Sequence, residues 1–153
     1  MRLIVAVVGK PRNAALAAAI LDYENRAARY WPLEVREVRE ERASSNDQLR
    51  VRKREAERLL ERVDGSRIVA CEERGKRMTS IEFSEWLSSE RDRAGDIALV
   101  IGGAFGLADE VREKSALSLA LAPWTLSHEL ARLVLAEQLY RAGTIMRGEP
   151  YHK

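Results

Sequence analysis

The sequence predicts an α/β fold in which a mostly parallel sheet carries helices on both of its faces. Two aliphatic runs, Leu3–Val8 and Ile97–Ile101, contain no alternating polar residues, as in strands buried on both faces of a parallel sheet. Segments with helical spacing of apolar residues separate the strand-like runs, so strand and helix alternate throughout. No linker, repeat or low-complexity tract divides the chain, and we expect residues 1–153 to form a single domain.

The first half of the chain begins this alternation. After the strand at Leu3–Val8, an alanine-rich segment predicts a helix over about 13–30, and Pro32 interrupts it. Apolar residues alternate with charged ones over 33–38, which predicts a short strand whose charged side chains face water. A strongly charged helix over 49–63 follows. Four residues before it are possible N-caps: Ser44, Ser45, Asn46 and Asp47.

The second half continues with three more strands and two more helices. Thr79 and Glu82 form a capping-box pattern that opens one helix. The last helix is expected over 127–142, where Gly143 stops it. The strands are expected at residues 67–71, 97–101 and 117–121.

Composition excludes several classes of protein. Hydrophobic residues make up 46% of the chain and charged residues 33%, which argues against disorder. No apolar run approaches the roughly 20 residues needed to cross a bilayer, so no membrane association is expected. The single cysteine, Cys71, excludes a disulfide framework and a site with several cysteine ligands, and a reducing cytoplasm fits best. With only two histidines, no metal site is expected.

Charge is unevenly distributed along the chain. Residues 1–77 hold 18 Lys and Arg against 13 Asp and Glu, a net charge of +5, whereas the remainder is acidic. A basic half is compatible with a nucleic-acid surface. Glutamates and arginines also alternate there on expected helix faces, so a solvated surface explains the same pattern.

The most informative motif is the glycine cluster Gly102-Gly103-Ala104-Phe105-Gly106, directly after a predicted strand. Glycines allow positive φ and let a ligand lie against the backbone. In parallel sheets ligands bind beyond the carboxyl ends of strands, where the loop at 122–127 is also expected. The spacing is neither that of a dinucleotide-binding loop nor that of an ATP-binding loop. The glycines alone are equally compatible with a structural turn.

Other chemically useful residues give weaker signals. Ser127 is a possible N-cap for the last helix, and the helix N-terminus favours the neutral form of His128, although a lone histidine at this place more often has a structural or capping role. Cys71 ends a predicted buried strand and is interpreted as a small hydrophobe. No Gly-x-Ser-x-Gly motif supports serine hydrolysis. The tail at 147–153 contains aromatic, imidazole and cationic groups that could bind an RNA base, or it is simply a frayed end.

Together these stretches resemble the SPOUT-class methyltransferases, in particular the small single-domain family called RlmH, which methylates N3 of a pseudouridine in 23S ribosomal RNA. The resemblance covers essentially the whole chain. Five segments carry it by their order and spacing: residues 3–9, 99–107, 117–127, 128–142 and 150–153.

The resemblance implies a deep trefoil knot in the C-terminal half, an obligate homodimer and S-adenosylmethionine as cofactor, with S-adenosylhomocysteine as product. Backbone groups of three loops would make most cofactor contacts. This chain departs from the family pattern at Cys71, where leucine is usual, and at Ser127, where proline is usual. The corresponding cofactor-binding residues are Cys71, Gly102, Gly103, Leu121, Ala122, Pro123, Trp124, Thr125, Leu126 and Ser127.

For the reaction, the resemblance implies in-line attack of N3 on the methyl group after N3 has lost its proton. Four residues are candidates by position: His128, Arg141, Tyr151 and His152. Arg141 would stabilise negative charge, and a histidine or Tyr151 would assist proton loss. The tail would reach the partner subunit's cofactor pocket, so the active site would be shared.

The substrate implied is 23S ribosomal RNA, in the assembled ribosome rather than as free RNA, and binding to the basic half should weaken with salt. A non-catalytic ribosome-binding or RNA-binding module of the same fold is the alternative, favoured by the basic half and the two departures. A nucleotide-dependent Rossmann enzyme would bind NAD or ATP, and the glycine spacing argues against it.

Overall fold

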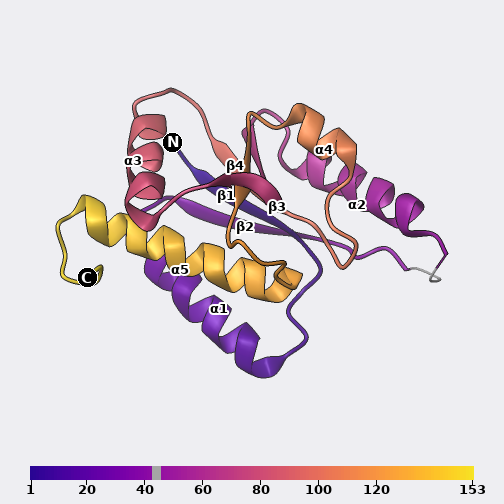
Figure 1. The fold of residues 1–153 in the computed structure, drawn as a ribbon, viewed down its shortest axis with the longest axis horizontal. Coiled ribbons are helices and arrows are strands. Elements are labelled where there is room, and N and C mark those ends of the chain that lie inside the picture. The colour runs from indigo at the N-terminus through magenta and orange to yellow at the C-terminus, as the bar shows by residue number, and fades with distance from the viewer. Residues whose placement is uncertain (43–45) are drawn as a thin grey trace.

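The computed structural model describes residues 1–42 and 46–153, and in these residues five parallel strands form one sheet in the order β2-β1-β4-β3-β5. Figure 1 shows α1, α3 and α5 on one face of the sheet and α2 and α4 on the other. The predicted fold class is therefore confirmed. The elements are β1 Leu3–Val8, α1 Ala14–Ala27, β2 Leu33–Val38, α2 Gln48–Arg62, β3 Arg67–Arg77, α3 Ser80–Arg91, β4 Ile97–Ile101, α4 Asp109–Lys114, β5 Leu117–Ala120 and α5 His128–Met146.

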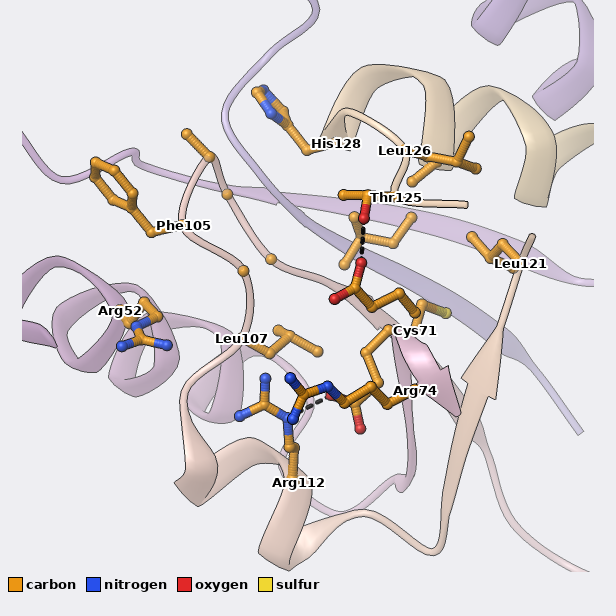
Figure 2. Close-up of a pocket in the computed structure, with 18 of the residues that line it drawn as sticks. Arg52, Cys71, Arg74, Phe105, Leu107, Arg112, Leu121, Thr125, Leu126 and His128 are labelled. Carbon is orange, nitrogen blue, oxygen red and sulfur yellow. Dashed lines mark hydrogen bonds and ion pairs between the residues drawn. The ribbon is translucent and has the colours of Figure 1, made fainter. Parts of the chain in front are cut away.

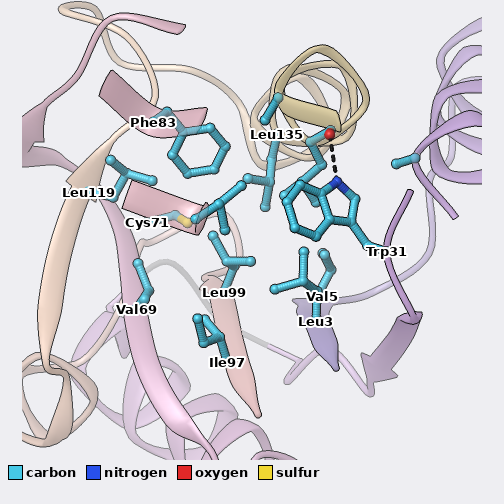
Figure 3. Close-up of a cluster of buried hydrophobic side chains, with 14 of the residues drawn as sticks. Leu3, Val5, Trp31, Val69, Cys71, Phe83, Ile97, Leu99, Leu119 and Leu135 are labelled. Atoms are coloured by element: carbon cyan, nitrogen blue, oxygen red, sulfur yellow. Dashed lines mark hydrogen bonds between the residues drawn. The ribbon is translucent and has the colours of Figure 1, made fainter. Parts of the chain in front are cut away.

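The central strands are apolar throughout because both sides of the sheet are covered. Alternate residues of β1 face opposite layers: Leu3 and Val5 pack with α1, α3 and α5, whereas Ile4 and Ala6 pack with α2 and α4. Figure 3 shows the first of these layers, where the Trp31 indole nitrogen donates to a backbone carbonyl of α5 at 2.8 Å. No helix of the described residues is long and apolar enough to span a membrane.

β3 is longer than predicted, and its extra residues are irregular. The strand was expected to end at Cys71 but continues to Arg77. Cys71 and Lys76 both pair with Leu119, so residues 72–75 bulge out of the ladder with β5. A Cβ on Gly75 would lie 2.5 Å from the backbone carbon of Leu119, so only glycine allows this return of β3 against β5.

α5 is also longer than predicted, because Gly143 does not end it. The helix runs to Met146 and is followed by Gly148 at φ +65°. A Cβ on Gly143 would lie 2.5 Å from the Cβ of Tyr30, so this glycine allows the close approach of the segment after α1. The expectation that Gly143 stops the helix was wrong because glycine served interhelical packing instead of a C-cap.

The predicted N-caps form side-chain hydrogen bonds at α3 but not at α2. The Thr79 and Glu82 capping box is confirmed, with the Glu82 N–H donating to the Thr79 hydroxyl at 3.2 Å and the Thr79 N–H to the Glu82 carboxylate at 2.6 Å. At the start of α2, Asp47 is the N-cap but makes no side-chain cap hydrogen bond. Two other expected N-cap residues, Ser44 and Ser45, lie outside the described residues.

A buried ion-pair network attaches α5 to α1 and β2. Arg132 is 7% exposed, and its guanidinium donates to Glu24 at 2.7 Å and to Glu37 at 2.8 Å. Glu37 lies on β2, so the expectation that every charged side chain of this strand faces water was wrong for it. The network orients the first turns of α5, where His128 begins the helix.

Candidate functional site

A cavity of about 770 Å³ opens beyond the carboxyl ends of β3, β4 and β5 (Figure 2). Three segments surround it: the bulge at 72–75, the glycine loop at 102–106 and the loop at 121–127. The parallel sheet places all three at the same edge, because the strands that precede them run in one direction. The site predicted from the glycine cluster therefore coincides with a cavity of the size of a small-molecule site.

Most residues named as cofactor-binding line this cavity. Pro123 and Ser127 do not line it; Ser127 instead caps α5, its hydroxyl accepting from the Leu130 N–H at 3.4 Å, as its N-cap pattern predicted. Trp124 is 78% exposed at the rim. The lining includes Cys71, Gly102, Gly103, Leu121, Ala122, Trp124, Thr125 and Leu126, together with His128 from the candidate catalytic group.

The glycine loop folds tightly on itself. A Cβ on Gly102 would lie 2.6 Å from the carbonyl carbon of Gly106, and Gly106 itself has φ +80°. The Gly106 N–H donates to the Gly103 carbonyl at 3.0 Å. The loop is therefore a structural turn and a wall of the cavity at once, and its glycines present backbone to the cavity beside the side chain of Phe105.

Two buried titratable groups lie close to the glycine loop. Burial raises the pKa of the Cys71 thiol to about 12, so the thiol is neutral and serves as an apolar wall, as expected from the sequence (Figure 3). Glu55 on α2 is 2% exposed, and burial raises its pKa as well. One of its oxygens accepts from the Glu41 N–H at 3.1 Å, while the other, beneath Gly103, has no partner among the described residues.

The polar side of the cavity was missed in the sequence. It comes from the β3 bulge and from α4, neither of which was predicted, and from the cavity-facing side of α2. Arg112 bridges Glu72 and Asp109, with 2.7 Å to Asp109, and the Thr125 hydroxyl donates to Glu73 across the cavity. The one available signal was the charged run after Cys71, which does not fit a buried strand. The missed residues include Gln48, Arg52, Glu72, Glu73, Arg74, Asp109 and Arg112.

The other three candidate catalytic residues gather at the opposite end of α5. The Tyr151 hydroxyl donates to Glu137 at 3.0 Å, and Arg141 forms an ion pair with Glu137 at 2.5 Å. The Arg141 guanidinium carbon lies 4.7 Å from the centre of the Tyr151 ring, and its Nη1 lies 3.3 Å from Nδ1 of His152. Burial, more than these hydrogen bonds, raises the pKa of Tyr151. The tail therefore packs on α5 and is not a frayed end.

Within one chain this C-terminal cluster does not reach the cavity. His128 and Arg141 are thirteen residues apart on α5, a separation of about 20 Å along a helix. Figure 1 shows the C-terminus at the end of α5 opposite to the start of the helix. The structure thus places His128 with the cavity and Arg141, Tyr151 and His152 away from it.

Comparisons with known proteins decide the family. A family model described as "Predicted SPOUT methyltransferase" matches residues 1–152. The chain belongs to the SPOUT methyltransferase family. Among its SPOUT relatives, the ribosomal RNA large subunit methyltransferase H of Gemmatimonas aurantiaca is 56% identical over the full length of both chains. The protein of the same name from Anaeromyxobacter sp. strain Fw109-5 is 46% identical, again over the full length of both.

Solved structures agree with the fold. A probable methylase family protein from Haemophilus influenzae superposes with a TM-score of 0.59 at 16% identity, over 99% of this chain and 70% of that one. At this identity the similarity concerns the fold alone. It agrees with the five-stranded parallel sheet and its two helical layers.

Proposed function

We propose that this chain is a ribosomal RNA methyltransferase that transfers a methyl group from S-adenosylmethionine to N3 of a pseudouridine in 23S ribosomal RNA. The observation that carries the proposal is the three-walled cavity, found in a chain 56% identical throughout to a ribosomal RNA large subunit methyltransferase H. The assembled ribosome is the proposed form of the substrate and the cytoplasm the proposed location, both following from the family resemblance.

The cavity fits this cofactor in its shape and chemistry. A Cβ on Gly102 would collide with the backbone of Gly106 and one on Gly103 with Glu55, so these glycines allow the tight turn that brings loop backbone to the cavity, where a flat adenine or ribose would lie against it. Cys71, Leu121 and Leu126 supply apolar surface. The two departures from the family pattern are compatible with binding, because a neutral buried thiol replaces one apolar group by another and a serine at 127 caps α5.

The bound cofactor would supply an electrophilic methyl group on a sulfonium, leaving S-adenosylhomocysteine. The protein residues would align the base and promote loss of the N3 proton. Arg141 is fixed by its ion pair with Glu137 and would counter negative charge on the deprotonated base. His128 or His152 would accept the proton, whereas the raised pKa of Tyr151 keeps its phenol neutral and suits it to hydrogen bonding; no metal is required by this chemistry.

We further propose that the active site is completed by a second copy of the chain in a homodimer. Within one chain about 15 Å along α5 separates Arg141 from Ala131, the lining residue of this helix that lies nearest to it, and the Arg141 guanidinium is engaged by Glu137. The tail of one subunit would place Arg141, Tyr151 and His152 beside the cavity of the other. The aromatic and cationic groups of that cluster are of the kind that bind an unstacked RNA base.

Two measurements test the proposed function. Purified protein should bind S-adenosylmethionine in calorimetry at millimolar concentration or below. Mass spectrometry of 23S RNA should then show one pseudouridine that loses its methyl group when the protein is removed from the cell. Cofactor binding without any change in RNA methylation would overturn the assignment of 23S ribosomal RNA as the substrate. Absence of cofactor binding would favour the non-catalytic RNA-binding module.

A further inference from the structure

Two arginines line the cavity without a partner in the described part of the chain. Arg52 comes from α2 and Arg74 from the β3 bulge, where the tight return at Gly75 holds the chain next to the cavity (Figure 2). Nε of Arg52 is buried and finds no acceptor in residues 1–42 and 46–153. Arg112, by contrast, is neutralised by Glu72 and Asp109. An unpaired guanidinium N–H is costly to bury, so Arg52 is poised for an anion that the described residues do not supply, and the exposed Arg74 is free to contact the same ligand.

The surroundings of Arg52 favour a nucleic acid as the source of that anion. α2 carries six basic and three acidic residues, and three of its arginines, Arg50, Arg54 and Arg58, are ion-paired to carboxylates. Phe105 also lines the cavity and is drawn on the same side of it as Arg52 in Figure 2. Cations beside an aromatic ring on an open groove are typical of sites for single-stranded nucleic acid, where bases stack and phosphates pair.

The cavity offers separate sides for cofactor and RNA. Arg52 belongs to the helical layer of α2 and α4, on one face of the sheet, whereas the loop at 121–127 leads into α5 on the other face. S-adenosylmethionine carries a single carboxylate, which can pair fully with only one of the two guanidiniums because they come from separate elements. An RNA strand carries successive phosphates and can pair with both. The phosphate backbone is therefore the anion that matches both arginines.

We propose that Arg52 and Arg74 bind phosphates of the RNA strand that flanks the target nucleotide, with Phe105 stacking on a neighbouring base. This inference rests on the proposed function and adds to it the path of the substrate strand. Arg52 and Arg74 would then act on substrate affinity, and the cofactor would bind without them.

The test compares Arg52→Gln and Arg74→Gln with Lys53→Gln, which removes an exposed cation from α2 that does not line the cavity. Methylation is measured on large ribosomal subunits from cells lacking the protein, at several KCl concentrations and constant Mg²⁺. Each arginine variant should raise KM for the subunits about tenfold and reduce the salt dependence of log kcat/KM by about 1. Lys53→Gln should change neither.

Calorimetry with S-adenosylmethionine separates the possible outcomes. Wild-type affinity in both arginine variants, with raised KM, supports the proposal and shows that the variants are folded. Weakened cofactor affinity would mean that the arginines bind the cofactor's carboxylate, and an unchanged salt dependence would mean that they bind no phosphate; either overturns the inference. If the wild-type protein itself neither binds cofactor nor methylates, the proposed function is wrong, and the inference that rests on it falls with it.

Discussion

Gly102 and Gly106 occupy the same turn but require glycine for different reasons. At Gly102 a side chain would collide with the backbone of Gly106, whereas at Gly106 there is open space and the constraint is the positive φ. A collision with backbone cannot be relieved by rotating a side chain, so it must deform the loop. Strain from φ alone costs roughly 1 kcal/mol and leaves the path of the loop intact.

We therefore expect Gly102→Ala to weaken S-adenosylmethionine binding at least tenfold, because the loop must open. Gly106→Ala, the matched control in the same turn, should lower the free energy of unfolding by about 1 kcal/mol and leave cofactor affinity within about threefold. Calorimetry and urea unfolding measure the two effects. Equal cofactor affinities in the two variants would show that the collision at Gly102 is harmless.

The buried carboxyl of Glu55 makes stability depend on pH. Its pKa is raised by burial, so the folded chain holds this proton more tightly than the unfolded chain does. The stabilising contribution of the protonated form is therefore present at low pH and is lost as the pH rises through the raised pKa. Above that raised pKa, an ionised carboxylate with one oxygen unpartnered among the described residues lowers the stability of the fold.

Glu55→Gln should consequently be more stable than the wild type at pH 8, and the difference should shrink as the pH falls toward the ordinary carboxyl value of 4.5. Urea unfolding at several pH values measures it. The control is Glu57→Gln on the exposed face of the same helix, whose surface ion pair contributes little at any pH. A variant less stable than the wild type at pH 8 would contradict the expected sign.

Capping residues predicted one end of α5 correctly and the other end wrongly. Its start followed from the Ser127 N-cap, but the predicted helix ended before Gly143, four residues too early, because only the fold shows that Tyr30 packs there. The residues that line the cavity could likewise be predicted only in part. Glycine spacing and family resemblance located its backbone walls, whereas Arg52 and Arg112 come from α2 and α4 and meet only through the tertiary fold. Aliphatic runs predicted the central strands well. Because these strands are covered on both faces, the side chains on both faces are buried and have to be apolar.

Gly143→Ala should destabilise the protein by about 1–3 kcal/mol, although alanine is normally favoured over glycine inside a helix. The reason is the overlap between the new methyl group and Tyr30. Urea unfolding of the single variant and of the same change in a Tyr30→Ala background measures it. In that background the substitution should be neutral or stabilising; persistent destabilisation would point to a cause other than Tyr30.

A shared active site predicts complementation between two defective chains. One chain would carry Gly102→Ala in the cavity and the other Tyr151→Ala with His152→Ala in the tail. At an S-adenosylmethionine concentration that leaves the Gly102→Ala cavity largely empty, each homodimer should show little activity, but in a mixed dimer one cavity and one tail are both intact. Co-expression in equal amounts should restore about a quarter of wild-type methylation, because about half of the dimers are mixed and each has one working site. A mixture as inactive as its components would place the whole site within one chain.

The three tryptophans differ in ways that an optical experiment can use. Trp31 is 2% exposed in the core and Trp124 is 78% exposed at the cavity rim, while Trp86 is intermediate. Emission from Trp31 should shift to the red only on unfolding, whereas emission from Trp124 should change when the cavity is filled. A protein in which Trp31 and Trp86 are replaced by phenylalanine would therefore carry its own fluorescent reporter of occupancy, without an attached dye.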